Sequence, residues 1–79
     1  MMKTIEKLLK AEKSTKAGNH AAIIDGMKRT FKYYWTAICS VDDEACTYHL
    51  DNGGYGTSST TRAINDYRRY FDDLGYTEV

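Results

Sequence analysis

Residues 31–71, FKYYWTAICSVDDEACTYHLDNGGYGTSSTTRAINDYRRYF, decide the fold of this chain. The first ten of them alternate between two sets of side chains, which is the pattern of a half-buried strand. One face of such a strand carries Phe31, Tyr33, Trp35, Ala37 and Cys39, and the other carries Lys32, Tyr34, Thr36, Ile38 and Ser40. We therefore predict one continuous strand over 31–40, with the first set facing the core.

A polar turn at 41–44 follows this strand and lets the chain return as a second strand. A four-residue turn pairs Cys39 with Cys46 and Trp35 with Leu50, and both pairs then lie on the apolar face. A slip of one residue would turn the returning apolar side chains to solvent, so the pattern predicts this register.

A helix is predicted after the hairpin, over 58–74. The glycine-rich segment 51–56 ends the second strand, and the hydroxyl residues 57–61 offer an N-cap. Gly75 stands where a left-handed C-terminal residue is wanted, and Tyr76 after it should touch the helix. Apolar side chains recur at helical spacing at Ile64, Tyr67, Phe71 and Leu74. Trp35 and Phe71 are expected to be the main contacts between sheet and helix.

The N-terminal part, 1–13, has the pattern of a short amphipathic helix that is too short to be stable alone. We expect it to dock on the sheet; membrane-surface binding is disfavoured because few large apolar residues face one way. Residues 20–27 fit either a strand or a helix. The strand is preferred, because Asp25 and Gly26 make a two-residue hairpin turn, whereas a helix would hold Gly26 in its interior.

The predicted fold is therefore α+β, in a single small domain over 1–79. A three-stranded antiparallel meander lies within 20–50, the C-terminal helix packs on it, and a short helix precedes it. With 11 Lys and Arg against 11 Asp and Glu, the net charge is zero, so no global field attracts nucleic acid or a membrane. Positive charge is nevertheless concentrated in 1–32, where eight basic side chains face three acidic ones.

A metal site is suggested by four residues, Cys39, Cys46, His49 and His20. Zinc needs ligands that converge on one point, but Cys46 and His49 point to opposite faces of a strand. The favoured interpretation is a pair of small, buried, reduced thiols and no cofactor. Catalysis is not indicated either, because the two histidines lie on unrelated segments and no pair of carboxylates shares a cleft.

A partner-binding surface is indicated by exposed aromatic and acidic side chains. The acidic turn is expected to be solvated, so reversing its charges should leave the fold intact. The residues assigned to this surface are Tyr34, Thr36, Ile38, Asp42, Asp43, Glu44, His49 and Asp51. Tyrosine favours protein contacts, although aromatic residues beside a lysine also suit single-stranded nucleic acid.

Residues 48–65, YHLDNGGYGTSSTTRAIN, resemble a stretch of small bacteriophage and prophage proteins of unassigned activity. In those proteins a strand ends in a Leu-Asp/Asn-x-Gly-Gly-aromatic turn, and a helix start of the form Thr-x-Thr-Thr-Arg/Lys-x-x-Ile/Leu-Asn follows. The resemblance covers about a quarter of the chain, and Tyr55 stands where Trp is common. It carries no functional residues over to this sequence.

The resemblance implies a phage origin and the cytoplasm of a bacterial host. In size and compactness the chain also resembles anti-CRISPR proteins. We therefore expect a non-enzymatic inhibitor that binds and blocks a host defence protein, most simply a CRISPR effector nuclease. The alternative is a small nucleic-acid-binding phage accessory protein. For the inhibitor we expect a monomer or weak homodimer, with no membrane partner and no direct binding of nucleic acid.

Overall fold

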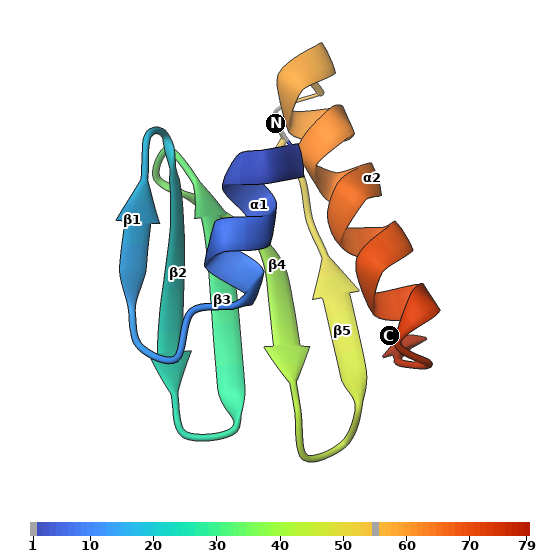
Figure 1. Cartoon of the computed structure of the whole chain (residues 1–79). Coiled ribbons are helices and arrows are strands. Elements are labelled where there is room, and N and C mark those ends of the chain that lie inside the picture. The colour runs from blue at the N-terminus through green and yellow to red at the C-terminus, as the bar shows by residue number, and fades with distance from the viewer. Residues whose placement is uncertain (1, 55) are drawn as a thin grey trace.

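A computed structural model describes residues 2–54 and 56–79, and it is an α+β fold with two helices on one side of a sheet (Figure 1). Met1 and Tyr55, which belong to the predicted N-terminal helix and glycine-rich turn, lie outside the described residues. The elements in chain order are α1 (Met2–Leu9), β1 (Thr15–Ala17), β2 (His20–Asp25), β3 (Lys28–Tyr33), β4 (Thr36–Asp42), β5 (Thr47–Leu50), α2 (Ser58–Asp73) and β6 (Thr77–Glu78).

The sheet of the described residues has six strands in the order β1-β2-β3-β4-β5-β6, rather than the three predicted. Each strand pairs with its neighbours in sequence, and all pairs are antiparallel except β5 with β6. The two additional edge strands are only three and two residues long, too short for an alternation of side chains to reveal them. The predicted antiparallel meander order is found in β1 to β5, but the number of strands was wrong and β6 adds a parallel pair.

The predicted strand over 31–40 is in fact two strands, β3 and β4, joined at Tyr34 and Trp35. Tyr33 pairs with Thr36, so the two residues between them form a tight hairpin turn. Tyr34 adopts a positive φ of 55°, which a bulky residue rarely does. The turn holds no Gly, Asn or Asp, so the alternation of side chains runs through it without a signal.

The β4–β5 register also differs from the prediction. Cys39 lies opposite Leu50, not Cys46, because the turn is 43–46 and begins two residues later than expected. Cys46 sits in that turn with a φ of 56° and is exposed.

A bulge in β4 turns Ile38 inward. Phe31 lies opposite Cys39 and Lys32 opposite Ala37, which leaves Ile38 as an extra residue on β4. Ile38 and Cys39 are both buried as a result. The prediction that Ile38 lies on the outer face, where it could touch a partner, was therefore wrong.

The segment 20–27 is a strand followed by a turn, which confirms the preferred alternative. Asp25 still belongs to β2 and pairs with Lys28, so the two turn residues are Gly26 and Met27. Gly26 has a φ of 59°, a conformation that glycine adopts without strain. The predicted turn was thus displaced by one residue.

The C-terminal helix forms as predicted. The Thr57 side chain accepts a hydrogen bond from the Thr60 amide and caps its start. At its end, the Tyr76 amide donates to the Phe71 carbonyl, and Gly75 has a φ of 89°. These contacts form the Schellman ending expected from the sequence, and the Tyr76 ring lies 5.4 Å from that of Phe71.

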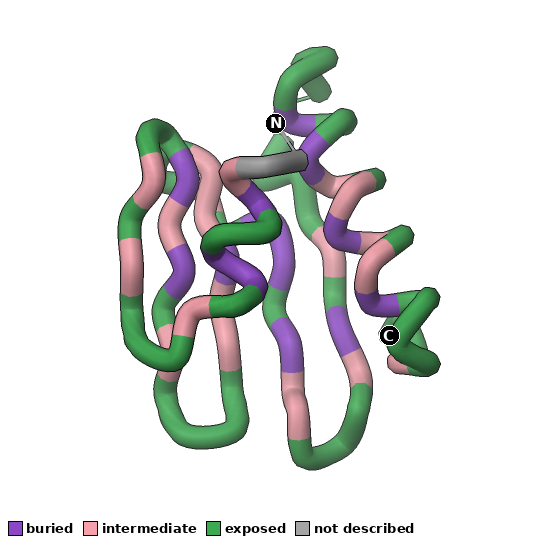
Figure 2. Tube along the Cα trace, viewed as in Figure 1, coloured by how far each residue is buried: buried purple, intermediate pink, exposed green. Residues whose placement is uncertain are grey.

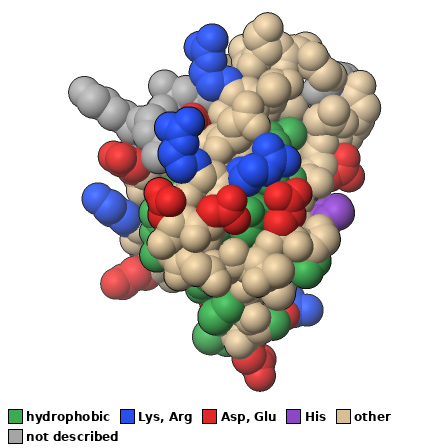
Figure 3. Space-filling view, turned by 90° about the vertical axis from the view of Figure 1, so that its right-hand side faces the viewer, with side chains coloured by type: hydrophobic (Ala, Val, Ile, Leu, Met, Phe, Trp, Pro, Cys, Tyr) green, Lys and Arg blue, Asp and Glu red, His purple; other side chains and the backbone are tan. Residues whose placement is uncertain are grey.

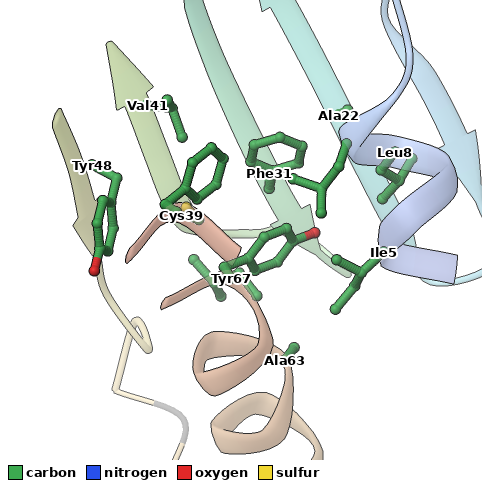
Figure 4. Close-up of a cluster of buried hydrophobic side chains, with 12 residues drawn as sticks. Ile5, Leu8, Ala22, Phe31, Cys39, Val41, Tyr48, Ala63 and Tyr67 are labelled. Atoms are coloured by element: carbon green, nitrogen blue, oxygen red, sulfur yellow. The ribbon is translucent and has the colours of Figure 1, made fainter. Parts of the chain in front are cut away.

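The core lies between the two helices and the sheet (Figure 2). Phe31 on β3 is its centre, with ring centroids 4.8 Å from Tyr67 and 6.2 Å from Phe71 of α2. The close-up in Figure 4 shows that Ile5 and Leu8 of α1 belong to the same core as Tyr67 of α2. The fully or almost fully buried apolar residues are Ile5, Leu8, Leu9, Ala22, Phe31, Ile38, Cys39, Val41, Tyr48, Ala63, Tyr67 and Phe71.

Trp35 does not belong to this core. Its relative exposure is 92%, so the predicted contact between Trp35 and Phe71 does not exist. Docking of α1 on the body was predicted correctly, and Ile5, Leu8 and Leu9 supply it. Because both helices cover the same face, the opposite face of the sheet carries no helix among the described residues.

Candidate binding site at the aromatic turn

Tyr34 and Trp35 form the turn between β3 and β4, which we call the aromatic turn. They are 58% and 92% exposed, so two large rings stand in water at one end of the sheet. An exposed tryptophan gains nothing from burial and does not support the fold. The exposure of these two rings is therefore not explained by packing of the core.

The aromatic turn is held in place by the neighbouring hairpin turn, Gly18–Asn19. The Tyr34 amide donates to the Asn19 carbonyl at 2.7 Å. The Asn19 side-chain amide donates to the Tyr34 hydroxyl at 3.1 Å. The Tyr33 ring lies edge-on to the Tyr34 ring at 4.7 Å. These contacts fix a backbone conformation that otherwise costs about 1–3 kcal/mol, so the turn backbone and the Tyr34 ring are held in place.

Two hollows flank the aromatic turn, and Tyr34 and Trp35 line both of them. The larger one, of about 470 Å³, lies toward the start of α2, and the smaller one, of about 310 Å³, lies toward β1 and β2. The other residues of the larger hollow are Tyr33, Thr36, Ile38, Asn52, Thr57, Ser59 and Thr60. Those of the smaller hollow are Lys16, Gly18, Asn19, His20, Ala21 and Lys32.

A glycine allows the loop before α2 to close the larger hollow. A Cβ atom on Gly53 would overlap Cγ2 of Thr36 at the start of β4. Gly53 also has a φ of 61°, and its amide donates to the Asp51 carboxylate at 2.8 Å. The loop thus packs directly against the strand that follows the aromatic turn.

The electrostatic character of this end is one-sided. Neither hollow has a carboxylate among its described lining residues, and the smaller one has Lys16 and Lys32. His20 is almost fully buried beneath it, with its ring 4.7 Å from Tyr33. Burial lowers the pKa of His20, so the ring is neutral at neutral pH and the positive charge comes from the two lysines.

The residues assigned to a partner surface from the sequence lie at different ends of the sheet. Tyr34 and Thr36 belong to the aromatic turn and its larger hollow. Ile38 contributes only the buried floor of that hollow. His49 on β5 is exposed, and its Nδ1 lies 2.9 Å from the Val79 carbonyl oxygen.

The acidic turn lies at the opposite end, and most of its carboxylates are used within the fold. Asp42 accepts from the amides of Glu44 and Ala45. Asp43 accepts from Arg29 Nε and Nη2 and from the Tyr76 hydroxyl, each at 2.7 Å. Burial alone would raise the pKa of Asp43, but these hydrogen bonds hold it below its ordinary value. The acidic turn is therefore not the freely solvated patch that was expected.

The four residues of the suggested metal site are not brought together. Cys39 is buried in the core, and burial raises its pKa to about 12. Cys46 is exposed in the turn at the far end of the sheet from His20. Among residues 2–54 and 56–79, no three His, Cys, Asp or Glu side chains are grouped as metal ligands.

Sequence reasoning missed Trp35 as a surface residue, and missed Lys16 beside it. One signal was available: a ten-residue strand over 31–40 would have been longer than either of its predicted neighbours. A turn in its middle, at the Tyr-Tyr-Trp run, resolves that mismatch. Lys16 could not have been placed there without β1, which pairs it with Ala21.

The side of the molecule formed by α2 has a different character (Figure 3). Acidic and basic side chains are interspersed on it, and Arg68 pairs with Glu78 at 3.1 Å.

No helix in the described part of the chain is long and apolar enough to cross a membrane. Neither a protein-family model, nor a curated protein, nor a solved structure matches this sequence or fold.

Proposed function

We propose that this protein is a phage-encoded, non-enzymatic inhibitor that acts in the cytoplasm of a bacterial host by binding and blocking a host defence protein. The class of target we propose is a CRISPR effector nuclease. The observation that carries the proposal is the aromatic turn, in which Trp35 is 92% exposed on a backbone fixed by Asn19. The resemblance of residues 48–65 to phage proteins supplies the biological setting.

Exposed aromatic side chains on a fixed turn suit a binding role. Tryptophan and tyrosine are over-represented among the few residues that dominate binding energy at interfaces. The Tyr34 ring, which Asn19 and Tyr33 already hold, loses little conformational entropy on binding. The larger hollow beside Trp35 gives a partner a place to insert an apolar group.

The polar groups of the chain also support binding rather than catalysis. Burial in the core raises the pKa of Tyr67, and the other two phenols with raised pKa values, Tyr48 and Tyr76, are bonded to carboxylates inside the fold. Asp43 accepts from Tyr76, and the Tyr48 hydroxyl donates to Asp72. These pairs join α2 and the C-terminal segment to the sheet, so their perturbed pKa values have a structural cause.

The test is inhibition of CRISPR interference by a panel of effector types in a bacterial host challenged with phage. Trp35→Ala should remove protection of the phage against the effector that the wild-type protein inhibits. The matched control is Met27→Ala, because Met27 is also a large apolar residue, 54% exposed, in the hairpin turn at the opposite end. Inhibition unchanged by Trp35→Ala, or equally impaired by Met27→Ala, would contradict a role for the aromatic turn.

The alternative, a small nucleic-acid-binding accessory protein, is favoured by one specific observation. Lys16 and Lys32 lie beside the two exposed rings with no carboxylate among the described residues that line that hollow. Direct binding of oligonucleotides by the free protein, without inhibition of any effector in the panel, would favour this function over the first.

A further inference from the structure

We infer that the aromatic turn binds single-stranded nucleic acid, with a base stacked on Trp35 and phosphates held by Lys16 and Lys32. The inference rests on the proposed function only in taking the aromatic turn as the contact surface. A CRISPR effector as target is compatible with this binding, because such an enzyme holds a guide RNA and a displaced DNA strand. The binding itself needs no effector and can be measured on the free protein.

The aromatic part of the argument is the accessibility of the rings. Both faces of a base in a single strand are available for stacking, and each stacked base contributes about 1–3 kcal/mol. Trp35, at 92% exposure, presents its indole ring without any rearrangement of the fold. In an intact duplex the bases already stack on each other, so a protruding ring has no base face to reach.

The cationic part of the argument is the register of the sheet. Lys16 on β1 and Lys32 on β3 both lie opposite Ala21 on β2, so the three residues form one row across the strands. The small side chain of Ala21 does not fill the space between the two lysines, whose positions are about 10 Å apart. Two neighbouring phosphates of a strand that crosses the aromatic turn can therefore each meet one ammonium group.

The charge of this row is not neutralised locally, unlike that at the other end of the sheet. There Lys28 lies between Asp25 on β2 and Asp42 on β4 in the same register. At the aromatic turn, the described residues lining both hollows include no Asp or Glu. The zero net charge of the whole chain predicts no binding of nucleic acid, but this local distribution favours it.

The salt dependence of binding follows from the two lysines. Each phosphate contact with a single strand contributes about −0.7 to the slope of log K against log salt, so two contacts give about −1.4. A protein partner held by the apolar hollow would show a much weaker dependence on salt. The slope thus separates the two kinds of ligand.

The experiment uses Trp35, the only tryptophan in the chain, as its own reporter. Oligothymidylate, oligouridylate, a mixed-sequence DNA duplex and thymidine monophosphate are titrated separately against the tryptophan fluorescence of the full chain. We expect the two single strands to quench Trp35 with the salt slope given above, and the duplex and mononucleotide to bind at least about tenfold more weakly, a difference of 1.4 kcal/mol.

Variants are measured by anisotropy of a fluorescently labelled oligothymidylate. Trp35→Ala should weaken binding by about 5- to 150-fold, the equivalent of one lost stack. The double variant Lys16→Glu with Lys32→Glu should also lose binding. Lys28→Glu is the matched control, because its charge is flanked by Asp25 and Asp42, and it should bind like the wild type.

Four results would overturn the inference. They are no quenching by either single strand, equal affinity for the duplex, equal affinity for the mononucleotide, and equal loss of binding in Lys28→Glu and the double variant. Inhibition of an effector that depends on Trp35, without any binding of oligonucleotides, would point to a protein contact and leave the proposed function standing. Circular dichroism checks that each variant is folded, because Trp35, Lys16 and Lys28 are exposed but Lys32 is half-buried.

Discussion

Replacing Asp43 by alanine should destabilise the fold even though Asp43 lies in a turn. The side chain accepts three hydrogen bonds, two from Arg29 and one from Tyr76, each 2.7 Å long. Arg29 and Asp43 side chains are only 15% and 20% exposed. The Arg29 guanidinium also lies 5.3 Å from the Phe71 ring, so the substitution leaves a positive charge beside the core without its counter-ion.

The expected loss can be estimated from these contacts. Removing one partner of a buried ion pair costs about 3–5 kcal/mol. The exposed fifth of Asp43 lets water solvate Arg29 in part, so we expect about 2–3 kcal/mol in the variant. A domain of this length has a total stability of about 4–12 kcal/mol, so the loss is a large share of it.

Urea unfolding followed by far-ultraviolet circular dichroism measures this loss. Tryptophan fluorescence is a poor probe of unfolding, because Trp35 is already in water in the folded state. Glu44→Ala is the matched control: Glu44 is an exposed acid in the same turn, and its stability should stay within about 0.5 kcal/mol of wild type.

The pH dependence gives a second measure of the same contacts. Because the pKa of Asp43 is lowered in the fold, its contribution is complete above the ordinary value of 3.8 and is lost as the pH falls through the lowered one. An Asp43→Ala variant as stable as Glu44→Ala, with an unchanged acid transition, would refute the view that this turn is locked to the core.

The remaining predictions concern the core and the titratable groups. Phe71→Ala should cost about 3–5 kcal/mol in urea unfolding, whereas Trp35→Ala should change stability by less than about 0.5 kcal/mol; the reverse order would place Trp35 in the core after all. Iodoacetamide should label Cys46 rapidly in the native protein and Cys39 only after unfolding, as mass spectrometry can show. Because burial lowers the pKa of His20, stability should fall as the pH drops below the ordinary value of 6.5, and His20→Phe should flatten that decline if folded.

The parts of the fold that could be predicted are those with local causes. Helix α2 follows from the Thr57 cap, the spacing of Tyr67 and Phe71, and the glycine at position 75, all within one segment. The strand character of 20–25 was likewise visible from the glycine that follows it. Such features need no knowledge of distant residues.

The parts that could not be predicted depend on contacts between distant segments. The aromatic turn is fixed by Asn19, which is 15 residues away from Tyr34. The inward position of Ile38 depends on a bulge relative to β3, and alternation along a strand cannot show such a shift. The candidate site was therefore predicted only in part: Tyr34 and Thr36 were identified, but Trp35 was assigned to the core.

The order of the strands also bears on how the chain reaches its fold. Strands β1 to β5 are joined by short turns, so each can pair as soon as its neighbour has formed, which is a feature of rapid folding. Strand β6 is different, because helix α2 separates it from β5 in the sequence. We therefore expect β6 to pair with β5 only after α2 has formed and docked on the sheet. The Thr77 and Val79 amides, which donate to the Cys46 and Tyr48 carbonyls, should thus be the last to gain protection in pulse-labelled hydrogen exchange.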